Sequence, residues 1–242
     1  MEVTRAVVFD LDDTLYLERN YVASGFRHVS NAVCEYCDAP TQEIFNFLWC
    51  EFEAGVRGDA FNRLIARYRS LTPRWIVEDL VEVYRSHQPV IQLLPNIKEL
   101  LGALVKARVR LALLTDGPVA AQSCKIAALG LTDWFNFLVL TDIWGTEYRK
   151  PHPRGFRTTM SLLGLPAEQL VYVGDNPEKD FQTPRGMGWG TVRLRLPGQL
   201  RCLTEPTSAD CAAEREIGSI PSLTQQLSNM CALQPFADGS PS

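Results

Sequence analysis

The sequence predicts an α/β protein with a doubly wound, mostly parallel sheet and an inserted all-α helical bundle. Short apolar runs of β-type residues recur along the chain and alternate with amphipathic helical segments. The stretch of about ninety residues between the first two runs is far longer than one crossover helix. The 242 residues, 46% hydrophobic and 21% charged, suffice for one α/β domain and a smaller inserted one.

The predicted strands are short and apolar throughout, as expected for strands that are buried on both faces of a parallel sheet. They are Arg5–Phe9, Val109–Leu114, Phe137–Leu140, Leu170–Val173 and Thr191–Leu194. Right-handed crossovers place the connecting helices on the two faces of such a sheet, and ligands bind beyond the carboxyl ends of its strands. The residues that follow each strand are therefore the first candidates for a functional site.

Helical segments lie between these strands. The segments expected to cover the sheet are Asn96–Lys106, Pro118–Leu129 and Pro153–Leu163. Gly130 and Gly164 supply stop signals after the last two.

The long insertion reads as helical throughout. Its expected helices are Tyr21–Cys37, Thr41–Glu53, Asp59–Tyr68 and Pro73–Ser86. Asp59 can cap the third, and Thr72 is expected to cap the fourth with Pro73 at its first position. The aromatic residues are expected to form the core of the bundle rather than a ligand-stacking surface. They are Phe26, Phe45, Phe47, Trp49, Phe52, Phe61 and Trp75.

These elements predict the domain organisation. Residues 1–15 and 92–232 are expected to form the α/β core, and residues 16–91 the helical insertion. Residues 233–242 are small, polar and proline-containing and are expected to be flexible.

Charge and hydropathy exclude several classes of function. The net charge of −4 gives no electrostatic basis for binding nucleic acid or an anionic membrane. We find no apolar span long enough for a bilayer, and the N-terminus runs straight into a strand without signal-peptide character. The protein is therefore expected to be cytoplasmic, with neither nucleic acid nor membrane as a partner.

The 7 cysteines cannot all be paired. Cys34 and Cys37 have zinc-knuckle spacing, but no second cysteine pair or histidine pair follows them. The pair lies in an apolar helical stretch, so we interpret these residues as free thiols and assign the cysteines no function.

Asp10 and Asp12 follow the first strand, in the stretch Asp10-Leu11-Asp12-Asp13-Thr14-Leu15. Carboxylates this close to a core are costly, and burial beside like charge raises their pKa. One interpretation is a strand that ends in an acidic turn. The other is a loop that carries a nucleophile, a general acid/base and a divalent-metal site.

Polar residues follow three further strands. Thr115 and Asp116 stand between a strand and a helix, where a hydroxyl and backbone amides suit phosphate but where a simple helix cap is also common. Lys150 lies in a loop and could neutralise a nucleophile or a phosphate. Asp175 and Asp180 flank a glycine-containing turn and suit a hard cation with oxygen ligands.

Together these motifs resemble those of the haloacid dehalogenase superfamily: a strand with DxD, a strand with Thr, a loop with Lys and a strand with GDx4D. The resemblance extends from Val3 to about Leu194. The helical insertion directly after the first motif resembles the type 1 cap of that superfamily, which is typical of small-molecule phosphatases.

The resemblance implies a mechanism and a cofactor. Asp10 would attack a phosphoryl group and form an aspartyl-phosphate, and Asp12 would protonate the leaving oxygen and then deprotonate water. Lys150 would neutralise charge at this site, which would otherwise repel a dianionic phosphate. Mg²⁺ would be held by Asp10, the backbone carbonyl of Asp12 and Asp175, with Asp180 as a ligand or behind the ligands. The phosphoryl oxygens would be bound by Thr115 and the Asp116 amide, and Thr14 would orient the loop.

The same residues narrow the activity. The dehalogenases that name the superfamily lack an acid at the position of Asp12, and its presence indicates phosphate-ester chemistry. The phosphonate-cleaving relatives use a cap lysine, whereas the first lysine of this chain is Lys98. Sugar-phosphate mutases more often carry glycine at the position of Asp13, which is a suggestive argument only.

We therefore expect a Mg²⁺-dependent phosphatase of a small phosphorylated metabolite, with a sugar phosphate slightly favoured. A nucleoside 5′-monophosphate phosphatase and a non-catalytic protein that binds a phosphorylated ligand or partner stay open as alternatives. Of the cap arginines, Arg19 and Arg57 are the better candidates for contact with the substrate. The sequence names neither the substrate nor the oligomeric state.

Overall fold

The computed structural model describes residues 3–72 and 74–232. Within them, a parallel sheet has the strand order β3-β2-β1-β4-β5-β6. Its strands are β1 (Ala6–Phe9), β2 (Arg110–Thr115), β3 (Phe137–Leu140), β4 (Leu170–Gly174), β5 (Gly190–Leu194) and β6 (Arg215–Ile217). The predicted doubly wound α/β fold is confirmed. The expectation of a flexible end at 233–242 concerns residues outside those described.

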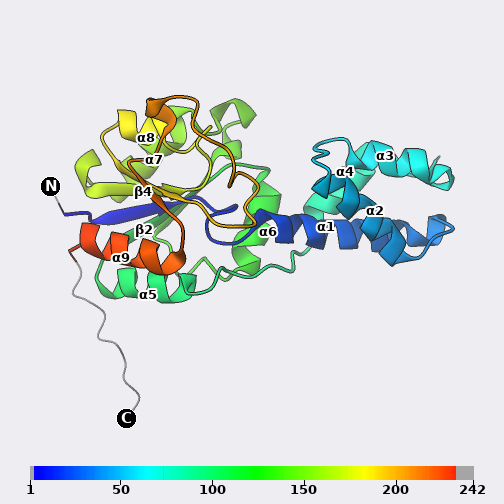
Figure 1. The fold of residues 1–242 in the computed structure, drawn as a ribbon, viewed down its shortest axis with the longest axis horizontal. Helices are drawn as coiled ribbons and strands as arrows, with labels where there is room; N and C mark the ends of the chain where they lie inside the picture. The colour runs from blue at the N-terminus through cyan, green and yellow to red at the C-terminus, as the bar shows by residue number, and fades with distance from the viewer. Residues whose placement is uncertain (1–2, 73, 233–242) are drawn as a thin grey trace, which may run out of the picture.

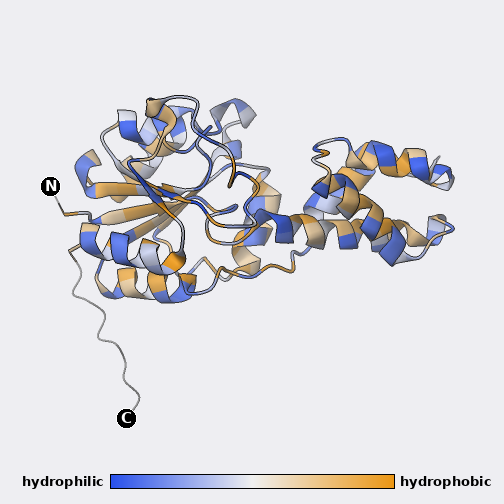
Figure 2. Ribbon diagram, viewed as in Figure 1, coloured by the Kyte–Doolittle hydropathy of each residue, from blue (hydrophilic) through white to orange (hydrophobic). Residues whose placement is uncertain are grey.

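Successive residues of β1 pack on opposite faces of the sheet. Val7 and Phe9 belong to one buried cluster, whereas Ala6 and Val8 belong to another. The first cluster includes residues of α5 (Ile97–Lys106), α6 (Val119–Ala128) and α9 (Ile220–Met230), and the second includes residues of α7 (Pro153–Leu163). Figure 1 shows α5 and α9 on one side of the sheet and α7 and α8 (Gln182–Gly186) on the other. Figure 2 shows the central strands as mostly hydrophobic.

The insertion forms a separate helical bundle, which we call the cap. It consists of α1 (Glu18–Val33), α2 (Thr41–Glu53), α3 (Ala60–Arg67) and α4 (Val77–Ser86). Figure 1 shows it standing off from the sheet, at the end where α1 leaves the α/β core. The two segments that connect it to the core lie side by side, because the Leu94 amide donates to the Leu15 carbonyl at 2.9 Å.

The cap has its own hydrophobic core, with Val29, Leu48, Leu64 and Leu80 fully buried. Of the seven aromatic residues expected there, Phe26 and Phe52 are buried and the others pack partly exposed around them. Four short helices enclose too small a volume to cover so many large rings completely. All the cysteines are free thiols.

The N-terminus of α4 differs from the prediction. The helix begins at Val77, where the Asp79 side chain accepts a hydrogen bond from the Ile76 amide at 3.1 Å. The expected cap at Thr72 is wrong, because Thr72 instead follows a 3₁₀ turn over Arg69–Leu71. Pro73, its expected neighbour in the helix, is outside the described residues.

The register of the central strands sets up the functional site. Phe9, the last residue of β1, pairs with Leu113 of β2 and with Val173 of β4, so the three strands end within two residues of one another. The Asp10 amide also donates to the Val173 carbonyl at 2.9 Å. The polar residues that follow β1, β2 and β4 are thus brought to one edge. Of the helices in the described ranges, none combines the length and the hydropathy that a membrane span requires.

Candidate active site

Asp10 is buried at the end of β1, and its side chain is only 1% exposed. The Lys150 Nζ lies 2.8 Å from its Oδ1, and the Lys179 Nζ lies 3.8 Å from its Oδ2. Within the described ranges neither oxygen accepts a well-directed hydrogen bond. Burial raises the pKa of Asp10, and the two lysines oppose that shift. This carboxylate is therefore held beside positive charge, with lone pairs left for a ligand.

Lys150 is a buried cation of the site, and several contacts hold its side chain in place. Its ammonium group contacts Asp180 Oδ1 at 2.8 Å and the Tyr172 hydroxyl at 2.7 Å, and its side chain is fully buried. Burial alone would lower the pKa of Lys150, but Asp10 and Asp180 outweigh that effect and raise it. Lys150 therefore stays charged.

Three carboxylates form the one group of potential metal ligands found in the described part of the chain. Asp10, Asp175 and Asp180 each offer an oxygen, and these oxygens lie within 4.8 Å of one another. Asp180 is already oriented by Lys150 and by the Asn176 amide, which donates to its Oδ2 at 2.9 Å. Burial raises the pKa of Asp175 well above its usual value, and Asp180 and Asp10 add to the shift. An all-oxygen donor set with excess negative charge fits a divalent cation such as Mg²⁺.

The Asp12 carboxylate faces helix α6 and is not part of this metal-ligand group. Lys125 Nζ contacts its Oδ1 at 2.7 Å, Gln122 Nε2 donates to its Oδ2 at 2.9 Å, and the Tyr16 hydroxyl donates to Oδ1. Burial alone would raise the pKa of Asp12, but the Lys125 ammonium outweighs it and the pKa is lowered. A metal contact through the Asp12 carbonyl stays a prediction.

The predicted phosphate-binding residues adjoin this group. Thr115 is fully buried at the end of β2, and its hydroxyl accepts from Gln122 Nε2 at 2.5 Å. The Asp116 Oδ1 accepts from the Thr141 hydroxyl at 2.8 Å and from the Lys150 amide at 3.0 Å. The Thr14 hydroxyl is buried and finds no hydrogen-bond partner in the described ranges, so its expected role in orienting the loop stays a prediction.

A cavity of about 550 Å³ opens over these residues. Asp12, Asp116 and Asp175 line it together with several cations from different parts of the chain. The cations are Arg57, Arg149, Lys150, Lys179 and Arg201. The cavity thus combines potential metal ligands with positive charge suited to an anionic ligand.

Comparison with known proteins identifies the family. Residues 4–188 match the haloacid dehalogenase-like hydrolases. The chain belongs to this family. The expected resemblance, to a phosphatase-type member with an inserted helical cap, is thereby confirmed.

Named relatives and solved structures of the family agree with this. A glyceraldehyde 3-phosphate phosphatase of Methanocaldococcus jannaschii is 26% identical over 210 residues, which cover 85% of this chain and 91% of the relative. A magnesium-bound putative hydrolase of the family from Bacillus subtilis superposes with a TM-score of 0.66 at 18% identity, covering 96% of this chain and all of that one. A hydrolase of the family from Deinococcus radiodurans, with bound phosphate and sodium, gives 0.65 at 21%, covering 96% and 98%.

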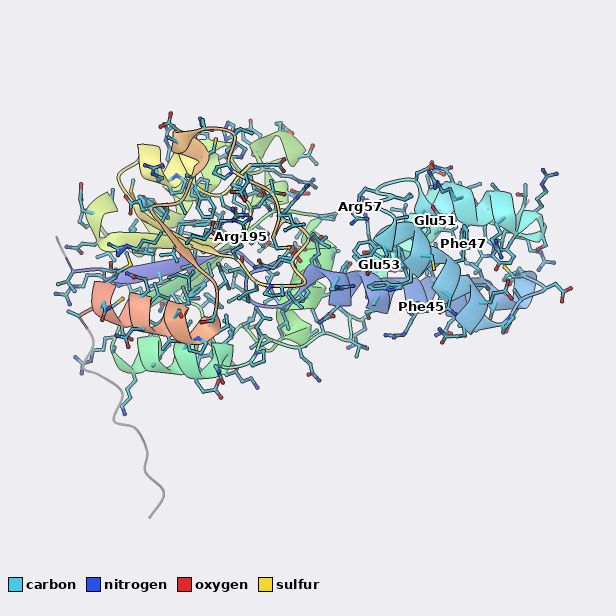
Figure 3. All side chains as sticks on the ribbon, in the orientation of Figure 1. Phe45, Phe47, Glu51, Glu53, Arg57 and Arg195 are labelled. Carbon is cyan, nitrogen blue, oxygen red and sulfur yellow. The ribbon has the colours of Figure 1, made fainter. Side chains whose placement is uncertain are left out.

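In this haloacid dehalogenase-like hydrolase, the two cap arginines are placed differently. Arg57 lines the 550 Å³ cavity and lies on the side of the cap that faces the core (Figure 3). Its guanidinium stacks 4.1 Å from the Phe52 ring centre and donates to the Phe52 carbonyl at 2.7 Å. Arg19 instead forms an ion pair with Glu53 and is absent from the cavity lining. A substrate contact by either arginine stays a prediction.

The residues of the site that were not anticipated from the sequence include Lys125, Lys179 and Glu18. Lys179 lies in the predicted GDx4D turn, directly before Asp180, so its position there is a signal that could have been used. Lys125 lies in the middle of α6 and Glu18 at the start of α1, where charged residues are ordinarily solvated. Only tertiary packing brings them to the cavity or to Asp12.

Proposed function

We propose that this hydrolase is a Mg²⁺-dependent phosphatase that acts on a small phosphorylated metabolite through an aspartyl-phosphate intermediate. The observation that carries the proposal is the environment of Asp10. Its buried carboxylate lies between the ammonium groups of Lys150 and Lys179 and shares a potential metal site with Asp175 and Asp180. The phosphatase relatives support the same reaction class.

In the proposed reaction, an Asp10 oxygen attacks phosphorus while the ester oxygen of the substrate leaves. Water then attacks the same phosphorus, which releases phosphate and regenerates the carboxylate. Lys150 and Lys179 lower the repulsion between this carboxylate and a dianionic substrate. Bound Mg²⁺ would supply further charge neutralisation at the phosphoryl oxygens.

Asp12 is proposed to carry the protons. It would give a proton to the leaving oxygen and then take one from the attacking water. The Lys125 ammonium at 2.7 Å favours its ionised form, which suits the second step. The first step requires the protonated form, so the Asp12 side chain must then leave Lys125.

Sugar phosphates are one class of substrate to examine, because the Methanocaldococcus relative is named for a triose phosphate. Nucleoside 5′-monophosphates are the second, because aromatic rings of the cap wall a cavity beside the catalytic one. A non-catalytic role is less well supported, since Asp10, Lys150 and the metal-site carboxylates all lie together.

The test is phosphate release from para-nitrophenyl phosphate and from a panel of phosphorylated metabolites, with and without Mg²⁺. We expect Mg²⁺-dependent turnover that the Asp10→Asn variant loses while it keeps its fold by circular dichroism. An absence of metal-dependent turnover across the whole panel would overturn the proposal.

A further inference from the structure

A second cavity lies directly beside the catalytic one, within the cap. It has a volume of about 280 Å³. Glu18, Arg57 and Leu200 line both cavities, so the two meet at these residues. A group attached to a phosphoryl in the catalytic cavity can therefore reach into the cap cavity.

Four aromatic residues, Phe26, Phe52, Phe61 and Tyr84, line part of the cap cavity. The Phe26 ring centre lies 6.4 Å from that of Phe52, 6.1 Å from that of Phe61 and 5.8 Å from that of Tyr84. The Phe26–Phe52 and Phe26–Phe61 pairs meet edge to face, and Phe61 and Tyr84 meet in the same way at 5.8 Å. These contacts join the rings into one aromatic cluster beside the cavity, against which a further ring can pack.

The two cavities share a polar junction, and Arg85 lines the cap cavity alone. The Glu18 carboxylate forms no hydrogen bond or ion pair with the described residues, whereas the Glu18 amide is held by Asp13 at 2.7 Å. The Arg57 guanidinium donates to backbone carbonyls and has no carboxylate partner in the described ranges. The junction thus offers an acceptor and a cation, and the lining beyond it is mostly apolar, with Arg85 as a further cation.

We propose that the cap cavity binds the leaving group of the substrate and that this group carries an aromatic ring. The ring would pack among Phe26, Phe61 and Tyr84, and a hydroxyl or N–H group next to it would donate to Glu18. This inference rests on the proposed phosphatase function and names the class of phosphate ester. A triose or hexose, rich in hydroxyl groups, would leave those hydroxyls without partners against the rings.

The test uses variants that reduce the volume of the cap cavity and leave the proposed catalytic residues unchanged. Ala60, the first residue of α3, lines the cavity, whereas Ala66 lies exposed on the same helix. Ala60→Phe places a ring in the cap cavity, and Ala66→Phe is the matched control. If Ala60→Phe has a markedly lower Tm than the unmodified chain, Val81→Phe fills the same cavity from α4.

The first readout is kcat/KM with benzyl phosphate, nucleoside 5′-monophosphates and glyceraldehyde 3-phosphate. We expect the unmodified chain to prefer one of the aromatic esters by about tenfold or more, the value of burying a ring. Ala60→Phe should remove that preference and leave glyceraldehyde 3-phosphate turnover unchanged, and Ala66→Phe should change neither. Which aromatic ester is preferred tells whether the ring is attached directly or through a ribose. Equal kcat/KM values for all the esters, or an equal loss for all of them in Ala60→Phe, would overturn the inference.

The second readout separates this inference from the proposed function. It is the Kd of benzylphosphonate and of methylphosphonate for the Mg²⁺-loaded chain, measured by calorimetry without any turnover. Tighter binding of benzylphosphonate that is lost in Ala60→Phe supports the aromatic site even if no ester is hydrolysed. Equal Kd values for the two phosphonates contradict the site even if hydrolysis occurs.

Discussion

Asp10 and Asp12 lie two residues apart, yet their carboxylates have different surroundings. Asp10 faces Lys150 and the potential metal ligands, and burial raises its pKa. Asp12 faces Lys125 and Gln122 on α6, and its pKa is lowered. The positions of the two carboxylates, rather than these pKa shifts, fit the proposed nucleophile among the potential metal ligands and the proposed proton carrier outside them.

The first prediction separates these roles. Asp12→Asn is expected to lower kcat by about a hundredfold or more, because it removes the proton carrier. Its Mg²⁺ affinity should stay close to that of the unmodified chain, since its side chain is not part of the metal-ligand group. Asp175→Asn should instead weaken Mg²⁺ binding by about tenfold or more. Calorimetric titration measures both affinities, and an equal loss in the two variants would contradict the assignment.

The second prediction concerns Glu18. Burial, with a further contribution from Asp12, raises the pKa of Glu18 to about 7. The carboxyl is therefore neutral below this pH and negative above it, in the cavity proposed to hold the phosphate ester. KM for a phosphate ester should rise as pH increases through about 7, and Glu18→Gln should flatten that rise. A KM–pH profile that is the same in both proteins would show that Glu18 does not face the substrate.

At the scale of elements, the loop after β1 is tied to the segment after β5. Asp13, at φ 55°, accepts from the Glu18 amide through Oδ1 and from the Leu200 amide through Oδ2, both at 2.7 Å. The buried Gln199 side chain donates to the Asp13 carbonyl at 2.5 Å. Asp13 thereby positions Glu18 and Leu200, which stand at the junction of the two cavities.

The third prediction follows from this link. Asn tolerates a positive φ but has one acceptor oxygen where Asp has two, so Asp13→Asn leaves one of the two amides without a partner. We expect a loss of about 1–3 kcal/mol in the free energy of unfolding. Urea denaturation measures this loss, with Asp38→Asn on the cap surface as the control. A variant as stable as the control would show that these hydrogen bonds contribute little.

At the scale of the whole molecule, strand order explains why residues distant in sequence form one site. The central strands β2, β1 and β4 end within two residues of one another, so the residues after them meet at one edge. Apolar runs and strand-end residues are local signals, and they predicted the sheet, the inserted bundle and the meeting of Asp10, Lys150 and Asp175. The three-residue strand β6 contains Arg215 and Glu216 and lies at the edge of the sheet. It therefore has no apolar run from which it could be predicted.

The position of the cap relative to the core had no such signal. The position of the cap depends on packing between the segments that connect it to the core. Because of this position, Arg57 lines the 550 Å³ cavity, whereas Arg19 forms an ion pair with Glu53. Lys125 likewise reaches Asp12 from 113 residues away, through the placement of α6. The boundaries of the domains at residues 16 and 92 stay predictions.

The fourth prediction links the metal site to global stability. A cation that binds only the folded chain stabilises it by about 2.7 kcal/mol at a hundredfold excess over Kd, so Mg²⁺ should raise Tm. Asp175→Asn removes one of three clustered carboxylates, so without metal it should melt at a higher temperature than the unmodified chain. It should also lose most of the Mg²⁺-induced rise. Scanning calorimetry checks both, and a full Mg²⁺ response in Asp175→Asn would contradict the site.

The most direct test of the account is capture of the covalent intermediate. Asp12→Asn is mixed with para-nitrophenyl phosphate that carries a radiolabelled phosphoryl group, in the presence of Mg²⁺, and the reaction is quenched in acid. The nitrophenolate leaves without a proton, so the intermediate should form while its hydrolysis is slow. We predict label on the protein that hydroxylamine releases and that is absent from the Asp10→Asn variant. Equal labelling of Asp10→Asn, or no labelling of a variant whose parent hydrolyses the ester, would contradict the assignment of Asp10 as the nucleophile.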